Sequence, residues 1–207
     1  MALGAVIRSF AAPSTSSRGL AWDGRALWHA SIVSDLIYQI DPSNGAVIRS
    51  FAAPSGVTLA VACDGRHLWV TDTGTDLIYQ IDPSNGKVIR SFAAPTSNSP
   101  ALAWDGRSLW ALDVLTGAIY QIDPRTGAVI RSFVVTASGA GALTWDGRHL
   151  WYSNEGADTI YEVDLRTGAV IRSFAAPSNS PAGLAFDGRS LWHVDRGNNL
   201  IYQLSMV

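Results

Sequence analysis

A repeat of constant length is the feature that most restricts what this chain can fold into. The heptapeptide GAVIRSF begins at Gly4 and returns every 41 residues, with lysine in place of alanine at Lys87, so that five units account for almost all of the 207 residues. The motifs DGR and LW return with the same step, and no insertion or deletion separates the units. Repeats of about 20 to 50 residues are typical of solenoids and propellers, in which each unit buries its apolar faces against its neighbours.

Each unit predicts four short strands, because its apolar segments are rich in β-branched and aromatic residues and are separated by turn residues. Asp23 and Gly24 predict a two-residue type I′ turn between the first two strands. The segment DPSNG predicts a type I turn between the last two, with Asp41 accepting amide hydrogen bonds and Gly45 left-handed. No segment has a helical pattern. In the first complete unit the strands are expected at residues 19–22, 27–30, 36–40 and 46–51.

The two ends of the chain each supply part of one further unit. Residues 5–10 read as a lone fourth strand, and residues 201–204 as a third strand without a DPxxG turn after it. We therefore predict an all-β, five-bladed β-propeller with four antiparallel strands per blade, closed by pairing the N-terminal strand with the C-terminal blade. It forms one domain over residues 1–207, in which residues 4–10 complete the last blade, and it is expected to be a monomer. A larger ring built by several chains and an open solenoid are the alternatives.

The first strand of each unit alternates small and large residues. We expect the small ones to crowd around a narrow central channel, and the large ones, such as Leu20 and Trp22, to fill the space between blades. Cys63 stands at a Trp22 position, which favours a buried thiol over a reactive one. The outer strands carry one arginine each, where a charge opposes edge-to-edge association. These arginines are Arg8, Arg49, Arg90, Arg131 and Arg172.

Composition excludes several kinds of partner. The net charge is −2 and no stretch concentrates cations, so nucleic acid is not an expected partner. No apolar run reaches the roughly 18 residues of a membrane span, and the opening residues lack the basic region of a signal peptide, so the compartment stays unassigned. The single cysteine and the absence of clustered Cys and His spacing predict neither a disulfide nor a structural zinc site, and no cofactor is expected.

The blade motifs resemble those of known propeller families. The run SPAGLAFDGRSLWHVDRGNNLIYQL, which starts at Ser180, is similar to the blade consensus of NHL and YVTN-type propellers. The IDPRTG turn at residues 122–127 resembles turns of the glutaminyl cyclotransferase-like five-bladed group and of streptogramin lyase-like propellers. The resemblance covers the whole chain and implies the fold, but no catalytic motif matches, so it implies no catalytic residue. The near-identity of the units is also similar to that of recently amplified or engineered symmetric propellers.

Differences among the units concentrate in two sets of loops, whereas the DGR and DPxxG turns hardly vary. Because the strands run alternately up and down, both variable sets should emerge on one face, which we name the variable-loop face. The fixed turns should emerge on the opposite, fixed-turn face. Variable loops on a rigid support would place any small-molecule or glycan site on this face, but loops that merely tolerate change are the favoured interpretation. The sets are 14–18, 55–59, 96–100, 136–141 and 178–181 between blades, and 31–35, 72–76, 113–117, 154–158 and 195–199 within them.

Seven residues at or near these loops are candidates for ligand contact. The aspartates could attract a cation as a ring of carboxylates, but they more simply accept hydrogen bonds from their own loop amides. The two histidines hold equivalent positions in neighbouring blades and could share a metal with Asp195, although packed or rim histidines are the favoured interpretation. His67 and His149, after DGR turns, are expected to be solvated. The candidates are His29, Asp72, Asp113, Tyr152, Asn154, His193 and Asp195.

Neither a GxSxG nor an HExxH motif is present, and nothing pairs two carboxylates for catalysis, so the sequence does not support an enzyme. The leading hypothesis is a non-catalytic repeat propeller, either a scaffold or binding module or a symmetric model protein without a defined ligand. A multivalent carbohydrate-binding propeller, with tryptophans beside the variable loops, is the alternative. A small-molecule lyase or cyclotransferase is a further one.

Overall fold

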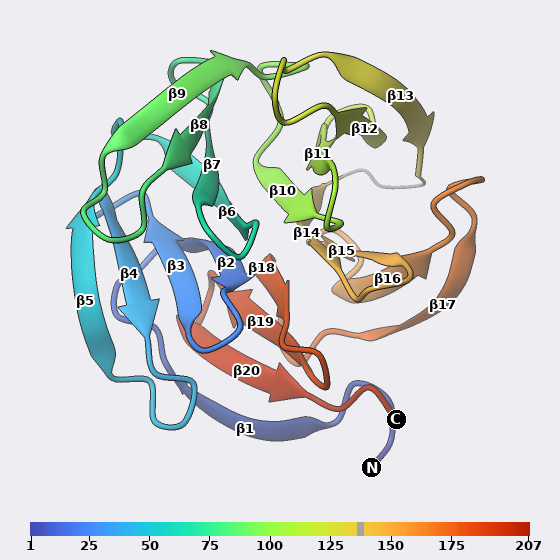
Figure 1. The fold of residues 1–207 in the computed structure, drawn as a ribbon. Helices are drawn as coiled ribbons and strands as arrows, with labels where there is room; N and C mark the ends of the chain where they lie inside the picture. Colours follow the sequence, from blue (N-terminus) through green and yellow to red (C-terminus); the bar gives the residue numbers. More distant parts are fainter. Residues whose placement is uncertain (136–138) are drawn as a thin grey trace.

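The computed structural model describes residues 1–135 and 139–207, and it shows a five-bladed β-propeller (Figure 1). In this part of the chain, twenty strands form five antiparallel sheets of four strands each. The first strand of each blade lies near the central axis and the fourth lies at the perimeter (Figure 1). The described residues include no helix that is long and apolar enough to cross a membrane. The predicted fold class is confirmed.

The strands follow the repeat. Blade 1 contains β2 (Ser17–Trp22), β3 (Leu27–Ser31), β4 (Leu36–Ile40) and β5 (Val47–Ala52). Blade 2 contains β6 (Thr58–Cys63), β7 (Leu68–Asp72), β8 (Leu77–Ile81) and β9 (Val88–Ala93). Blade 3 contains β10 (Ala101–Trp104), β11 (Leu109–Leu112), β12 (Ala118–Ile122) and β13 (Val129–Val134). Blade 4 contains β14 (Ala140–Trp145), β15 (Leu150–Asn154), β16 (Thr159–Val163) and β17 (Val170–Ala175). Blade 5 contains β18 (Pro181–Phe186), β19 (Leu191–Asp195), β20 (Leu200–Leu204) and β1 (Val6–Ala11).

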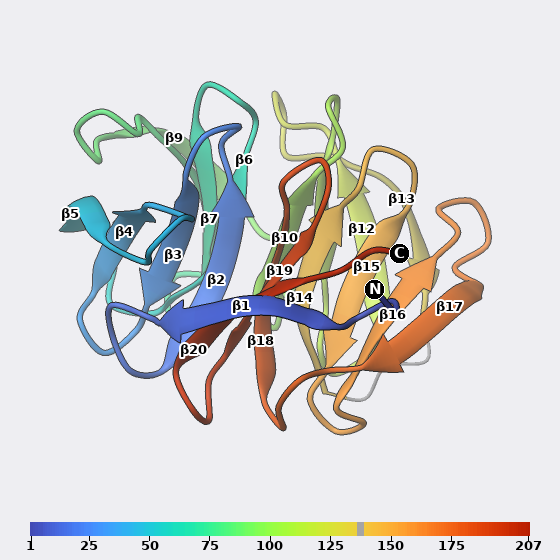
Figure 2. The same cartoon turned by 90° about the horizontal axis from the view of Figure 1, so that it is seen from below.

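Blade 5 is formed from both ends of the chain, as predicted. Its strand order is β1-β20-β19-β18, and Phe10 of β1 lies opposite Ile201 of β20. Outside the strands, the Gly4 amide donates to the Ser205 carbonyl at 2.8 Å, and the Ser205 amide donates to the Ala5 carbonyl at 2.9 Å. The two termini therefore lie side by side (Figure 2). Hydrogen bonds replace the covalent DPxxG turn of the other blades.

The turn between β2 and β3 differs from the type I′ prediction, which is wrong. Trp22 pairs with Leu27, so the loop has four residues, and its central pair is Gly24 and Arg25. Of these two, only Gly24 has a positive φ, of 95°, as in a type II′ turn. The reason lies in Asp23, which precedes the turn and uses its carboxylate to accept the amides of Arg25 and Ala26 at 2.8 and 2.7 Å.

The DPSNG turn is formed as predicted. The Asp41 carboxylate accepts the Ser43 amide, and the Asp41 carbonyl accepts the Gly45 amide, both at 2.8 Å. Gly45 has a φ of 78°, and a Cβ atom there would lie 2.5 Å from the ring of Phe10 in the neighbouring blade. Glycine is therefore required at this position for two reasons: the positive φ, and the close approach of the neighbouring blade.

In each complete blade, side-chain contacts around the buried tryptophan connect the DGR turn to the outer strand. In blade 1, the indole N–H of Trp28 donates to Asp23 at 2.7 Å, and the Phe51 ring lies 5.8 Å from the Trp28 ring. Arg49 covers Trp28 at 5.4 Å and also donates to the Ser84 carbonyl of blade 2 at 3.3 Å. The outer arginine thus stabilises the core side of its strand and bridges two blades, beyond the edge role expected for it.

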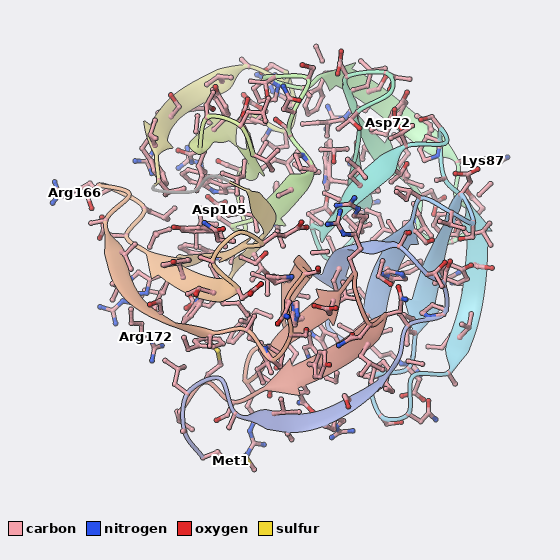
Figure 3. The ribbon with its side chains drawn as sticks, turned by 180° about the vertical axis from the view of Figure 1, so that it is seen from behind. Met1, Asp72, Lys87, Asp105, Arg166 and Arg172 are labelled. Carbon is pink, nitrogen blue, oxygen red and sulfur yellow. The ribbon has the colours of Figure 1, made fainter. Side chains whose placement is uncertain are left out.

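Other charged residues extend away from the ring. Lys87 and Arg166 lie at its perimeter and point outward (Figure 3). In the described part of the chain, the apolar residues instead gather in five clusters between successive blades, such as the one in which Leu20 packs with Leu27 and Trp192. The predicted role of the large alternate residues is confirmed.

The central channel is narrow, as predicted. At Gly19 a Cβ atom would lie 2.6 Å from the backbone nitrogen of Val61 in the next blade. The space along the axis is about 10 Å³ toward the variable-loop face and about 100 Å³ toward the fixed-turn face. Cys63 is half-buried beside the larger space, where burial raises the pKa of its thiol to about 11. The prediction of an unreactive thiol agrees with this environment. The wider end is also lined by Trp22, Trp104, Trp145 and Phe186.

Candidate functional site

The two sets of variable loops emerge on the same face and are tied together. In blade 2, Asp72 accepts the Ser55 hydroxyl and, at 3.2 Å, the Val57 amide of the preceding inter-blade loop. In blade 5, Asp195 accepts the Ser178 hydroxyl at 2.5 Å and the Ser180 amide at 2.8 Å in the same way. The predicted variable-loop face is confirmed for the described loops. Within the fourth inter-blade loop, residues 136–138 lie outside the described part of the chain.

The polar candidates also cap their own loops. Asp72 accepts the amides of Gly74 and Thr75 at 3.0 and 2.8 Å. Asp113, Asn154 and Asp195 accept amides of the loops that follow them in the same way. All four side chains are buried. The interpretation that these residues accept hydrogen bonds from their own loop amides is confirmed.

Hydrogen bonds also set the charge of these carboxyl groups. Burial on its own raises the pKa of Asp72, but the hydrogen bonds from Ser55, Thr75 and Val57 outweigh it and hold the pKa below the ordinary value. The same balance lowers the pKa of Asp113 and of Asp195. These carboxylates are charged at neutral pH, and the loops satisfy that charge.

Three of the candidates, His29, Tyr152 and His193, directly follow the buried tryptophan of their blade, and their side chains lie between blades. His29 and His193 have no exposed surface, and their rings stack on Tyr38 and Tyr202 at 6.1 and 5.8 Å. Tyr152 is equally buried, with its ring 4.9 Å from that of Tyr161. The packed alternative for the two histidines is confirmed. Burial lowers the pKa of both imidazoles to about 4, so they are neutral over most of the physiological range.

The predicted residues do not converge on one centre. His29, His193 and Asp195 form no group of ligand atoms within 4.8 Å, and neither do the three aspartates. Among the described residues, the group with this property is Asp146, His149 and Glu162 on the fixed-turn face.

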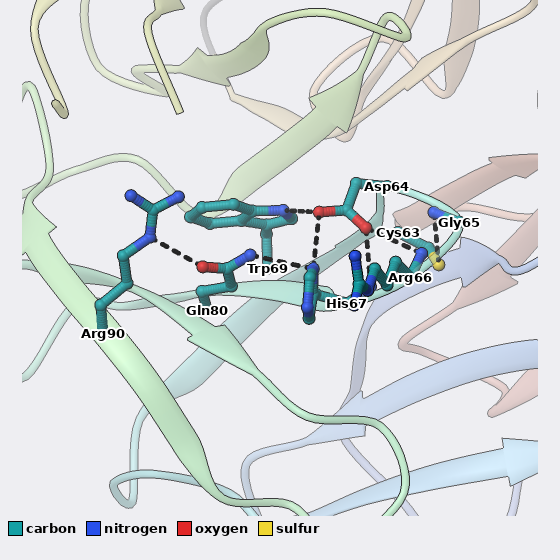
Figure 4. A network of polar contacts seen from close by, with 8 residues as sticks. All are labelled: Cys63, Asp64, Gly65, Arg66, His67, Trp69, Gln80 and Arg90. Atoms are coloured by element: carbon teal, nitrogen blue, oxygen red, sulfur yellow. Dashed lines mark hydrogen bonds and ion pairs between the residues drawn. The ribbon is translucent and has the colours of Figure 1, made fainter. Parts of the chain in front are cut away.

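The prediction that His67 and His149 are solvated is wrong, since both are half-buried and bonded. In blade 2, the His67 ring nitrogen lies 3.3 Å from Asp64 and 3.0 Å from the amide of Gln80, beside the Trp69 indole (Figure 4). In blade 4 the corresponding contact joins the His149 ring nitrogen to a carboxylate oxygen of Glu162 at 2.6 Å. The signal that could have found this pair is the replacement of Gln by Glu in one unit alone, the unit that also carries His149.

A cleft opens on the variable-loop face at blade 5. Its volume is about 430 Å³, and the carboxylate of Asp195 ties its two walls together. Asn179 and Gly197 are exposed at its edges. The lining residues are Pro177, Ser178, Asn179, Ser180, Asp195, Gly197 and Asn198. Of the seven candidates, the cleft includes Asp195.

A charged triad that sequence reasoning missed lies near this cleft. Glu155 of blade 4 pairs with Arg196 of blade 5 at 3.0 Å and with Arg18 of blade 1 at 3.7 Å. Burial, with a smaller contribution from the charge of Arg196, lowers the pKa of Arg18. Glu155 and Arg196 hold the same position of the repeat in neighbouring blades, so opposite charges at that position are the signal that could have found their pair. Arg18 stands at another position of the repeat and has no such signal.

The tryptophans do not lie beside the variable loops. The five of the LW motifs are fully buried, and the other three line the wider end of the channel at the fixed-turn face. The carbohydrate-binding hypothesis expected their rings next to the variable loops, so this support for it is lost. The buried five are Trp28, Trp69, Trp110, Trp151 and Trp192.

Comparison with known proteins supports the fold. No protein-family model and no curated protein matches this chain. Among solved structures, the Myxococcus xanthus glutaminyl cyclase is 14% identical, with a TM-score of 0.83 over 99% of this chain and 97% of that one. A virginiamycin B lyase from Staphylococcus aureus is 19% identical, with a TM-score of 0.59 over 94% of this chain and 68% of that one. The Cps50 (Swd1) propeller domain from Myceliophteria thermophila is 13% identical, with a TM-score of 0.60 over 99% and 100%.

At these identities the comparisons show the fold alone. The chain is a five-bladed β-propeller, and its fold is similar to that of the glutaminyl cyclase and of the lyase, as the IDPRTG turn predicted.

Proposed function

We propose that this protein is a non-catalytic binding module that takes a small polar ligand in the blade 5 cleft of the variable-loop face. The observation that carries the proposal is the cleft itself, whose volume of about 430 Å³ lies in the range of small-molecule sites, about 300 to 1,000 Å³. It is placed on variable loops that a rigid sheet supports, where propellers can change specificity without changing the fold.

The non-catalytic part of the proposal rests on how the cleft carboxylate is used. Asp195 is buried, and its two oxygens accept the Ser178 hydroxyl and the amides of Ser180 and Asn198. A general base needs a free lone pair directed at substrate and a pKa near the working pH. The pKa of Asp195 is instead lowered, because the hydrogen bonds outweigh burial, which raises it. We infer that Asp195 fixes the two loops of the cleft relative to each other and does not act on a ligand.

The polar character of the ligand follows from the lining. Serine hydroxyls, asparagine amides and backbone groups line the cleft beside the Pro177 ring and the buried Asp195, and the described lining contains no aromatic ring. Such a surface recognises hydroxyl or amide groups through hydrogen bonds, without the ring stacking that sugar-binding aromatic residues provide. Polyols, sugars and small amides are the ligand classes that fit.

The test is a two-dimensional NMR titration with glycerol, monosaccharides and small amides at millimolar concentration. We expect one class to shift the amide resonances of residues 177–180 and 195–198 in a saturable way. Asn179→Ala should weaken this binding at least fivefold, because Asn179 is exposed in the lining. Ser97→Ala, at the equivalent position of blade 3, is the matched control and should bind as the wild type does. Shifts spread over all blades, or none with any class, would contradict the proposal and favour a scaffold.

A cyclase or lyase is the second candidate, because the glutaminyl cyclase covers almost the whole chain with a high TM-score. Incubation with a peptide that begins with glutamine, followed by mass spectrometry, tests the cyclase. Cyclisation above the uncatalysed rate would replace the binding proposal with an enzymatic one.

A further inference from the structure

We infer that Asp146, His149 and Glu162 form a binding site for a divalent transition-metal cation, with zinc as the best fit. One ligand atom of each residue lies within 4.8 Å of the others, which is close enough for a single cation to contact all three after small movements. The site lies on the fixed-turn face of blade 4, so it is separate from the proposed ligand cleft.

The local backbone fixes two of the three residues. Asp146 and His149 belong to the turn between β14 and β15, in which one Asp146 oxygen accepts the amides of Arg148 and His149 at 2.7 and 2.6 Å. The other Asp146 oxygen accepts the indole N–H of Trp151 at 2.8 Å and keeps a second lone pair. Its direction is therefore set before any cation arrives.

Glu162 brings the third ligand on β16, and it is particular to this blade. The other four blades hold glutamine at its position, at Gln39, Gln80, Gln121 and Gln203. The Glu162 side chain is buried, with 3% of the residue exposed, and it contacts both Arg172 and His149. Buried carboxylates are rare unless they are paired or bind a metal. The replacement thus places a second negative charge where the other blades keep a neutral amide.

The surroundings match those of metal ligands. Coordinating carboxylates and histidines are oriented by further hydrogen bonds, a role that Trp151 plays for Asp146 and Arg172 for Glu162. With a neutral imidazole, the three ligands and Arg172 carry a net charge of −1, which favours a cation. Asp146 and His149 are half-buried, so a cation can enter from solvent and water can complete a tetrahedral shell.

The ligand types select the metal. One imidazole nitrogen with two carboxylate oxygens suits zinc and similar first-row cations. Magnesium and calcium prefer oxygen ligands alone and should bind weakly here. The His149 nitrogen and the Glu162 oxygen lie 2.6 Å apart, so a metal would replace their direct contact and move them apart slightly.

Blade 2 has the same aspartate and histidine, Asp64 and His67, but Gln80 replaces the second carboxylate (Figure 4). There, Asp64 accepts the Trp69 indole at 2.9 Å, and the His67 ring nitrogen lies 3.0 Å from the amide nitrogen of Gln80. An amide NH₂ group turned toward the imidazole offers a cation no lone pair. Glu162→Gln therefore converts the blade 4 site to the composition of blade 2. Because Arg90 donates to Gln80 at 2.7 Å, the matching arginine contact is expected to survive in the variant.

The experiment is a calorimetric titration of EDTA-treated, untagged protein with zinc chloride, with magnesium chloride as the comparison cation. We expect one zinc per chain, at least tenfold weaker binding in Glu162→Gln and in His149→Ser, and no response to magnesium. Serine is the residue that blades 3 and 5 hold at the His149 position. Cobalt titration should give the visible absorption of a nitrogen and oxygen shell in the wild type but not in the two blade 4 variants, and circular dichroism checks the fold of each variant.

His67→Ser is the matched control, since it removes the equivalent histidine of blade 2 and leaves blade 4 unchanged. It should bind one zinc with wild-type affinity. Three results would overturn the inference: no zinc binding to the wild type, which would leave only the direct contact of His149 with Glu162; unchanged binding in both blade 4 variants; or loss of binding in His67→Ser.

Discussion

At the scale of single residues, one position of the repeat shows how burial decides chemistry. The residue after each buried tryptophan lies between blades and is histidine in two units, valine, alanine or tyrosine in the others. The site is apolar enough to lower the pKa of His29 and His193 to about 4. An imidazole at this position behaves as a neutral packing group at pH 7, and its charge matters only when the protein is acidified.

Acidification should therefore destabilise the fold through these two histidines. In the unfolded chain their pKa is about 6.5, so between pH 6.5 and 4 the unfolded state binds more protons, and the free energy of unfolding falls as the pH falls. At pH 5 the loss is about 2 kcal/mol for each histidine relative to pH 7 or above. Urea unfolding at pH 7 and pH 5 measures it.

His193→Val provides the control, since valine fills this position in blade 2 as Val70. The variant should lose about half of the difference between the two pH values, and the double variant with His29→Val nearly all of it. Asp72 and Asp195 also affect the free energy of unfolding, but their lowered pKa values mean that this effect is lost at more acidic pH. A wild-type protein that is equally stable at both pH values would refute the assignment.

At the scale of elements, the turns connect one blade to the next. Gly45 ends the outer turn of blade 1 and lies against Phe10 of blade 5, and the glycines of the other outer turns contact the equivalent phenylalanines. Each phenylalanine ring lies close to the buried tryptophan of its own blade. A turn that looks like a local connection is thus part of the packing between blades.

Substitution of alanine for Gly24 and for Gly45 separates the cost of the positive φ from the cost of contact with the next blade. Gly24 and Gly45 both have positive φ, but a Cβ atom at Gly24 would have no neighbour within 4 Å, whereas one at Gly45 would meet the Phe10 ring. Gly24→Ala should cost about 1 to 2 kcal/mol of backbone strain. Gly45→Ala should cost about 1 to 3 kcal/mol more, because the ring must move. Urea denaturation gives both values, and equal losses would show that the contact with Phe10 is unimportant.

The elements also show what sequence reasoning could and could not reach. Strands and turns followed from a period that repeats five times, because each copy confirms the others. The turn at Gly24 was mistaken because the carboxylate of Asp23, which caps the loop, outweighs the dipeptide preference. The single replacement of glutamine by glutamate in blade 4 marks Glu162 as unusual. It does not say which side chain Glu162 contacts, because the contact with His149 depends on the pairing of β15 with β16. The blade 5 cleft depends on loop conformations that occur once, where no repetition helps.

At the scale of the whole molecule, the ring depends on a closure that no covalent turn supports. β1 joins blade 5 through its pairing with β20 and through Phe10, whose ring lies 5.9 Å from that of Trp192. Without β1, the edge of β20 would offer unpaired backbone groups, and exposed strand edges promote association. The predicted monomer therefore relies on this one strand to cover the last edge of the ring.

Removal of residues 1–11 tests that dependence. Light scattering should give a single-chain mass for the full-length protein and multiples of it for the truncated one, with a clearly lower midpoint of urea unfolding. A synthetic peptide of residues 1–14 should restore both properties, because it can pair with β20 as β1 does. A scrambled peptide of the same composition is the control and should restore neither. A truncated chain that stays monomeric and as stable as the full-length protein would show that the inter-blade clusters alone hold the ring closed.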